Sequence, residues 1–181
     1  MRIIAGLYRG KKLFSPLSDK IRPTSDKARE AVFDILTAKL EKSWSQICLA
    51  DVFAGTGAFG LEALSRGAES VTLVDIDTAT AAKNSALFAG EKNKIRLLKT
   101  DATRLPPAAQ GFDIIFFDAP YHQDLSGKAL DSALKQNWLK DDGICVVETA
   151  ADEDFAVPEN MELIDCRRYG IAKFWFLKFA K

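Results

Sequence analysis

Short apolar runs alternate with helix-like segments from residue 47 onward. The apolar runs predict strands over 47–53, 71–74, 95–98, 112–117 and 144–148. Helices are expected between them: one from the glycine-rich turn at 54–60 to about Ser65, one over about 78–89 and one over about 124–136. Alternation of this kind predicts an α/β fold in which a mostly parallel sheet has helices on both faces and right-handed crossovers.

Both ends of the chain depart from that alternation. Residues 162–168 and 172–179 are strand-like runs separated only by Tyr169 and Gly170. They lie too close together for a helical crossover, so they are expected to form an antiparallel hairpin at one sheet edge, the last two of seven strands. Near the start, apolar pairs at 3–4 and 13–14 flank Gly6 and Gly10, which predicts a small hairpin. Apolar positions at helical spacing after Pro23 predict a helix over about 25–40.

Length and composition indicate one soluble globular domain. The chain has 181 residues, of which 48% are hydrophobic and 28% charged. We expect residues 1–45 to form a basic N-terminal extension that packs with a core over 46–181 into one compact unit, and we expect a monomer. The apolar runs are far shorter than the roughly 20 residues of a membrane-spanning helix, and no secretory signal is recognised, so the expected location is the cytosol. Three widely spaced cysteines suggest buried thiols in a reducing compartment, with neither a disulfide nor a metal site.

The charges are unevenly distributed although they sum to zero. Residues 1–30 carry eight basic and three acidic side chains, a net charge of +5. Because the whole chain sums to zero, the remaining 151 residues carry a net charge of −5. A basic end on an acidic body is a hint of contact with phosphates. A solvated surface tail is the alternative explanation at this point.

The turn after the first predicted strand contains the first candidate site. Gly55, Gly57 and Gly60 fit the pattern G-x-G-x-x-G, in which glycines allow a sharp turn and close approach of a ligand to the backbone. An acidic pair, Asp75 and Asp77, ends the second strand. Asp75 stands 20 residues after Gly55, a spacing that suits an acid accepting hydrogen bonds from ribose hydroxyls.

This motif leaves two cofactors open. A nicotinamide dinucleotide would place its pyrophosphate at the glycines and the helix start. S-adenosylmethionine has no phosphate but carries a cationic amine and a sulfonium, which favour a carboxylate before the glycines, where Asp51 stands. Asp101, followed by Ala102 after the third strand, could accept from an adenine amino group, although a plain surface aspartate is an equal alternative.

The loop after the fourth strand favours methyl transfer to an amine. It reads Asp118-Ala119-Pro120-Tyr121. The Asp118 carboxylate and the Ala119 carbonyl would accept the two N–H bonds of an exocyclic amine, and so favour a more nucleophilic nitrogen. Pro120 would fix the turn, and Tyr121 offers a flat face on which the target base can stack.

Together these segments resemble the RsmD family, bacterial enzymes that methylate N2 of a guanine in small-subunit (16S) ribosomal RNA. The resemblance runs essentially end to end and rests on four blocks: Arg22-Pro-Thr-Ser-Asp-Lys-Ala-Arg-Glu-Ala-Val-Phe-Asp-Ile-Leu36, Asp51-Val-Phe-Ala-Gly-Thr-Gly-Ala-Phe-Gly-Leu-Glu-Ala-Leu-Ser-Arg-Gly-Ala68, Asp118-Ala-Pro-Tyr121 and Arg168-Tyr-Gly170. The glycine-rich loop is common to many methyltransferases, whereas the first block is the more specific signature. The resemblance implies a Rossmann-like class I methyltransferase fold.

The resemblance also implies a cofactor, a partner and a set of site residues. S-adenosylmethionine would bind at Asp51, Phe53, Ala54, Gly55, Thr56, Gly57, Asp75, Ile76, Asp101 and Ala102. The catalytic loop would be Asp118, Ala119, Pro120 and Tyr121. Ribosomal RNA or the small ribosomal subunit would contact Arg9, Lys11, Lys12, Arg22, Lys27 and Arg29, mainly through backbone phosphates.

One residue departs from the family pattern. The family usually has Asp-Pro-Pro-Tyr, and here Ala119 replaces the first proline. The carbonyl at 119 survives that change, so activity is expected to survive as well, with a less rigid loop. His122, the one histidine of the chain, is interpreted as a loop residue rather than a proton acceptor.

Other functions remain open from the sequence. The same kind of loop serves adenine N6 in DNA and glutamine amides in proteins. A nicotinamide-dependent oxidoreductase would leave the loop at 118–121 without a role. A non-catalytic RNA-binding module predicts that Asp118→Ala changes nothing measurable.

Overall fold

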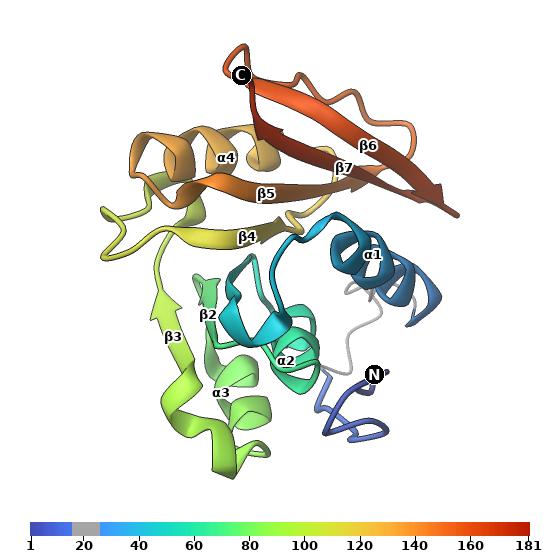
Figure 1. Ribbon diagram of the computed structural model, residues 1–181, viewed down its shortest axis with the longest axis vertical. Helices are drawn as coiled ribbons and strands as arrows, with labels where there is room; N and C mark the ends of the chain where they lie inside the picture. Colours follow the sequence, from blue (N-terminus) through green and yellow to red (C-terminus); the bar gives the residue numbers. More distant parts are fainter. Residues whose placement is uncertain (16–25) are drawn as a thin grey trace.

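A computed structural model describes residues 1–15 and 26–181, and in that part of the chain seven strands form one sheet (Figure 1). The order across the sheet is β3-β2-β1-β4-β5-β7-β6. The strands are β1 Cys48–Val52, β2 Ser70–Asp75, β3 Ile95–Lys99, β4 Phe112–Phe117, β5 Leu139–Ala150, β6 Met161–Tyr169 and β7 Ala172–Phe179. This order, with its last hairpin antiparallel, is the arrangement expected for a class I methyltransferase.

The first five strands are parallel, and β7 runs antiparallel to both of its neighbours. The carboxyl ends of β1 to β5 therefore lie at one edge of the sheet, and the turn between β6 and β7 lies at the same edge. The central strands β1 and β4 are buried along their whole length, which explains their mostly apolar sequences; Asp51 in β1 and Asp113 in β4 are the buried exceptions. The sheet thus confirms the predicted parallel core and C-terminal hairpin.

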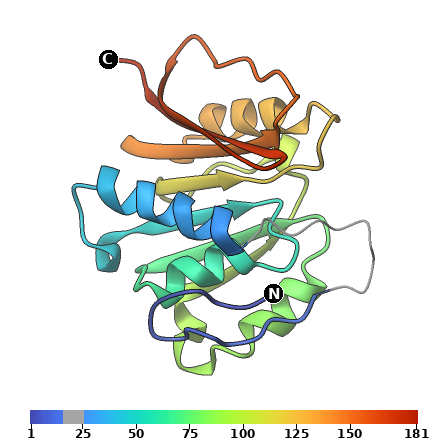
Figure 2. The same ribbon diagram turned by 90° about the vertical axis from the view of Figure 1, so that its right-hand side faces the viewer.

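Helices cover both faces of the sheet. On one face lie α1 Asp26–Lys39, α2 Ala58–Ser65 and α3 Ala79–Ser85, whose buried side chains share a core with Leu49, Ile114 and Val146. In Figure 2, α1 (blue) crosses in front of the sheet. On the other face, α4 Leu125–Lys135 packs through Ala129, Leu130 and Ala133. Three short 3₁₀ helices, Trp44–Gln46, Ala89–Lys94 and Ala102–Arg104, complete the described elements.

Two elements differ in extent from the sequence-based expectation. The helix expected over about 78–89 ends at Ser85, because Leu87 and Phe88 turn inward and Phe88 is fully buried beside the ring of Tyr8. The strand expected over 144–148 extends over Leu139–Ala150, because β4 and β7 pair with residues beyond the apolar run. Ladder pairing, not side-chain polarity, sets the length of this strand.

The N-terminal segment docks on α2. Its two arms are joined by one antiparallel bridge, Arg2 to Lys12, rather than by two full strands. The buried Glu62 carboxylate accepts hydrogen bonds from the backbone N–H groups of Ile4 and Ala5, at 2.7 and 3.0 Å. A Cβ at Gly6 would stand 1.9 Å from the carbonyl oxygen of Ser65, so a glycine is required at this close approach. On these contacts we propose that residues 1–45 and 46–181 form one compact unit.

Candidate active site

The candidate site lies at the carboxyl edge of the sheet, where the strand order reverses between β1 and β4. In open parallel sheets, ligands bind at this point. The loops that follow β1, β2, β3 and β4 all leave the sheet there, and these loops carry the sequence-predicted cofactor and catalytic residues. The fold therefore gathers segments that lie up to about seventy residues apart in the chain.

Asp51 is a carboxylate buried at the end of β1. Its side chain is only 2% exposed, and Oδ2 accepts the backbone N–H of Gly60 at 2.9 Å. Burial raises the pKa of Asp51 to about 7, the Gly60 hydrogen bond lowers it in part, and the charge of Asp75 raises it further. A cationic ligand group beside such a buried carboxyl would favour its ionised form.

The loop after β1 has a strained backbone. Phe53 has φ 66°, a left-handed conformation that non-glycine residues rarely adopt, and Gly55 and Gly57 follow with φ 53° and 75°. The loop is closed by hydrogen bonds from Ala54 N to Val74 O at 2.9 Å and from Gly57 N to Ala54 O at 2.7 Å. Strain held by its surroundings at such a turn is typical of ligand-binding loops.

Asp75 at the end of β2 holds this loop in place. Its Oδ2 accepts the N–H of Gly55 at 2.8 Å, and its Oδ1 accepts the N–H of Asp77 at 3.0 Å. A carboxylate has about four acceptor positions, so capacity for ribose hydroxyls remains. The next residue, Ile76, is 69% exposed and presents an apolar side chain at the same edge.

Asp101 caps the 3₁₀ helix that follows β3. Its Oδ1 accepts the N–H and the hydroxyl of Thr103, at 2.8 and 2.7 Å, and these hydrogen bonds lower the pKa of Asp101. Asp101 itself is exposed and the adjacent Ala102 is buried. The carboxylate therefore stands at the site edge in its ionised form, as an acceptor.

The Asp118–Tyr121 loop follows β4 directly. The N–H of Asp118 donates to the carbonyl of Val52 at 3.2 Å, which ties the loop to the end of β1. Burial holds the pKa of Asp118 well above its usual range, and the negative charges of Glu148 and then Asp51 add to that effect. Ala119 is buried and Pro120 is exposed. The loop thus begins on the sheet and ends at the surface.

Glu148 on β5 is a site residue that sequence reasoning passed over. It is 2% exposed, and its Oε1 accepts a hydrogen bond from the hydroxyl of Tyr121 at 2.7 Å. Phe117 pairs with Val147, so the next residues of the two strands, Asp118 and Glu148, stand side by side. The only sequence signal was one acidic residue at the end of an otherwise apolar strand.

Within residues 1–15 and 26–181, no group of three or more His, Cys, Asp or Glu side chains is arranged to hold a metal ion. In the same ranges, no helix has the length and apolar character needed to cross a bilayer.

The basic residues of the N-terminal part fall into different environments. Arg9, Lys12 and Lys27 are exposed. Lys11 is half-buried: its Nζ donates to the carbonyl of Leu87 at 3.0 Å and lies over two aromatic rings. Arg22 lies outside the described residues.

The position of Arg29 differs from the sequence-based expectation that this residue contacts RNA phosphates. Its side chain is buried, and Nη2 donates to the Arg2 carbonyl at 2.7 Å and to Asp26 at 3.1 Å. The guanidinium therefore does not stand at the surface for a phosphate contact. Its positive charge makes the smallest of the contributions to the pKa of Asp51, which it lowers.

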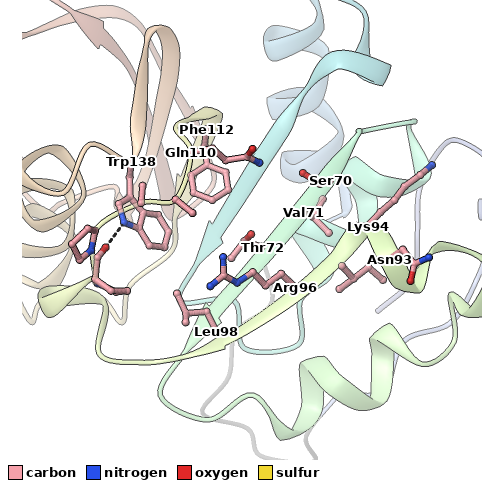
Figure 3. A pocket seen from close by; sticks show the side chains of 15 residues that line it. Ser70, Val71, Thr72, Asn93, Lys94, Arg96, Leu98, Gln110, Phe112 and Trp138 are labelled. Carbon is pink, nitrogen blue, oxygen red and sulfur yellow. Dashed lines mark hydrogen bonds between the residues drawn. The ribbon is translucent and has the colours of Figure 1, made fainter.

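A cavity of about 250 Å³ lies away from this site. It is lined by the starts of β2 and β3, by 106–110 and by Phe112 and Trp138 (Figure 3). Figure 3 shows Trp138 and Phe112 on one side and Thr72 and Arg96 on the other. Because Ser70 and Ile95 begin their strands, this cavity is at the end of the sheet opposite the candidate site.

Comparison with known proteins places the chain in a family. Residues 1–178 match the family described as conserved hypothetical protein 95. Ribosomal RNA small subunit methyltransferase D of Haemophilus influenzae is 35% identical over 180 residues, covering 96% of this chain and 91% of the relative. The Escherichia coli protein of the same name is 34% identical over 168 residues, covering 90% and 82%.

A solved structure agrees with this assignment. The structure described as putative methyltransferase yhhF from Escherichia coli superimposes with a TM-score of 0.80 at 30% identity, covering 99% of this chain and 97% of that one. Family and fold together set aside the nicotinamide-dependent alternative. The chain belongs to the conserved hypothetical protein 95 family, the RsmD family of ribosomal RNA small subunit methyltransferases.

Proposed function

We propose that this chain transfers a methyl group from S-adenosylmethionine to the exocyclic N2 amine of a guanine in small-subunit (16S) ribosomal RNA. Relatives that span most of the chain bear the name of an enzyme acting on that RNA. The observation that carries the proposal is the position of the Asp118–Tyr121 loop. It begins at the end of β4, tied by the Asp118 N–H to Val52 and thus beside Asp51.

The residues at the ends of β1 to β3 fit S-adenosylmethionine. Asp51 is a buried carboxyl whose ionisation a cationic amine would favour. Asp75 keeps acceptor capacity for ribose hydroxyls, Ile76 offers an apolar face for a ring, and Asp101 is an exposed acceptor. Phe53, Ala54, Gly55, Thr56, Gly57 and Ala102 would form the surrounding wall. When bound, S-adenosylmethionine would supply the methyl group from its sulfonium centre.

The loop after β4 would hold the target amine. The Asp118 carboxylate and the Ala119 carbonyl would each accept one N–H, which localises the nitrogen lone pair and stabilises the positive charge that develops on nitrogen. The proton lost from the methylated nitrogen would pass to Asp118 or to water. The Tyr121 ring would stack on the base and Pro120 would fix the turn.

The exposed basic residues would bind the RNA backbone. Arg9, Lys12 and Lys27 are available for phosphates, and Lys11 contributes charge although its amine is already engaged. Arg22 stays a member of the proposed set outside the described residues. Such contacts give affinity and orientation, whereas the base held in the pocket gives specificity.

The partner and setting follow from this proposal. We expect the protein to act as a monomer in the cytosol, on ribosomal RNA or an assembling small subunit. Adenine N6 and protein amides are the alternative acceptors that the loop chemistry allows. Mass mapping of 16S ribosomal RNA from cells with and without the gene separates them: loss of one N2-methylguanosine supports the proposal, and an unchanged modification pattern contradicts it.

A further inference from the structure

The hydrogen bond between Tyr121 and Glu148 joins a surface loop to the interior of the sheet. The hydroxyl donates to Glu148 Oε1 at 2.7 Å, the length of a well-formed O–H···O hydrogen bond. Tyr121 is half-buried, whereas Glu148 is 2% exposed. One end of the contact thus faces the substrate side and the other is inside the protein.

Glu148 is held rigidly by its strand. β5 pairs with β4 on one side and with β7 on the other, and Glu148 itself is opposite Phe174 of β7. Phe174 is fully buried, so there is little room for Glu148 to move. Side chains on interior strands hold their position better than side chains on loops.

The loop itself offers less restraint. Residue 119 is an alanine, which leaves its own φ free, unlike a proline. Two residues shortly after Tyr121, His122 and Asp124, have left-handed φ values of 59° and 50°. Non-glycine residues persist in that conformation only when surrounding contacts hold them. The hydrogen bond from Tyr121 to Glu148 is one contact that ties this loop to β5.

We propose that Glu148 is a positioning residue for the methyl transfer: it anchors the hydroxyl of Tyr121 and thereby fixes the ring on which the target base stacks. This inference rests on the proposed function. Glu148 does not touch the base in this arrangement, because it is buried behind the residues that would. An anchored ring holds the amine in line with the methyl group, whereas a free ring lets the base rotate out of line.

The anchor should affect turnover more than binding. RNA affinity comes from phosphate contacts elsewhere, so KM for RNA should change less than about threefold when the anchor is removed. The turnover number should fall about tenfold to a hundredfold, the range expected for a hydrogen bond to a charged group. Glu148→Gln keeps an acceptor oxygen and should lie between the wild type and Glu148→Ala.

The test is a double-mutant cycle on the full chain. Glu148→Ala, Glu148→Gln, Tyr121→Phe and the double variant Tyr121→Phe/Glu148→Ala are assayed for methyl transfer to small-subunit RNA. At a pH above the acid midpoint of the rate profile, where Asp118 is ionised in every variant, the double variant should be no slower than Tyr121→Phe alone, because both changes remove the same contact. Glu153→Gln, which alters a glutamate beyond the end of β5 that accepts the Ala150 N–H at 3.2 Å, is the matched control and should be fully active.

A second measurement does not depend on activity. With 3-fluorotyrosine at the three tyrosines, the fluorine resonance that disappears in Tyr121→Phe reports on residue 121. It should shift in Glu148→Gln and stay in place in Glu153→Gln. Additive rate losses, or a resonance unmoved by Glu148→Gln, would overturn the inference. If the wild type fails to methylate RNA, the proposed function fails, while the fluorine shift still decides whether Glu148 anchors Tyr121.

Discussion

The Asp51 carboxylate and the Gly60 backbone are packed against each other with no room between them. Gly60 N–H donates to Asp51 Oδ2 at 2.9 Å, and a Cβ at Gly60 would stand 3.3 Å from Asp51 Cβ and 2.3 Å from Leu73 Cδ2. The last glycine of the G-x-G-x-x-G pattern therefore serves close packing of α2 on β1 and β2. It also lets a helix backbone orient the buried carboxylate.

Gly60→Ala is expected to destabilise the protein. The usual helical gain of alanine over glycine, up to about 1 kcal/mol, is outweighed by overpacking of about 1–3 kcal/mol. Gly127→Ala in α4 is the matched control. Its Cβ would meet nothing closer than 3.8 Å, so this substitution should stabilise the protein. Urea unfolding of both variants measures the difference, and equal behaviour of the two would show that the close approach is not limiting.

Asp51→Asn should stabilise the protein at alkaline pH. The pKa of Asp51 is about 7 in the folded protein and 3.8 in an unstructured peptide, so the folded state binds this proton more tightly. Stability therefore falls as pH rises from about 4 to about 7. The asparagine variant avoids this loss, which amounts to roughly 4 kcal/mol at most, at about 1.4 kcal/mol per pKa unit.

Unfolding at pH 4 and pH 8 checks this expectation: the two proteins should be nearly equal at pH 4, and the variant more stable at pH 8. Calorimetry should show that the same variant has lost most of its affinity for S-adenosylhomocysteine. A variant that is less stable at pH 8 than the wild type would show that Asp51 is ionised and well solvated in the free protein.

The sequence predicted the strands well because buried parallel strands are almost purely apolar. It did not reveal the partners of Glu62 and Glu148, since those depend on contacts with residues 58 and 27 positions away. Arg29 was misjudged for a related reason: charge can be read along a chain, but the face of α1 that packs inward is decided by tertiary structure. The left-handed φ of Phe53 has no local signal, because the residue type disfavours it.

The rate of methyl transfer should fall as the pH is lowered, with a midpoint above the pKa of an ordinary aspartate. Asp118 must be ionised to stabilise the positive charge that develops on the amine nitrogen, and its pKa is raised by burial, Glu148 and Asp51. Glu148→Gln removes one of these causes, so the pKa of Asp118 falls and the acid midpoint of the rate profile moves to lower pH. The midpoint of the rate profile is compared rather than the maximal rate, because loss of the Tyr121–Glu148 contact lowers the maximal rate. A midpoint unmoved by Glu148→Gln would contradict the proposed coupling of the two carboxylates.

Neutralising the exposed basic residues should weaken RNA binding and leave cofactor binding unchanged. A variant with Arg9→Gln, Lys12→Gln and Lys27→Gln should lose affinity and show a shallower salt dependence, by about 0.7–0.9 in slope for each lost phosphate contact. Lys135→Gln, on α4 and paired with Asp131 at 2.6 Å, is the control. Fluorescence anisotropy over a salt series measures both. If the triple variant keeps the wild-type slope, these residues form only a solvated surface.

Methyl transfer in a purified system is the decisive measurement for the proposed function. The protein is incubated with labelled S-adenosylmethionine and small-subunit ribosomal RNA or particles, and the product is digested and mapped by mass. One N2-methylguanosine at a single position is predicted for the wild type, and none for Asp118→Ala, which should still bind S-adenosylhomocysteine. Label on adenine or on protein, or equal transfer by Asp118→Ala, would contradict guanine methylation by this loop.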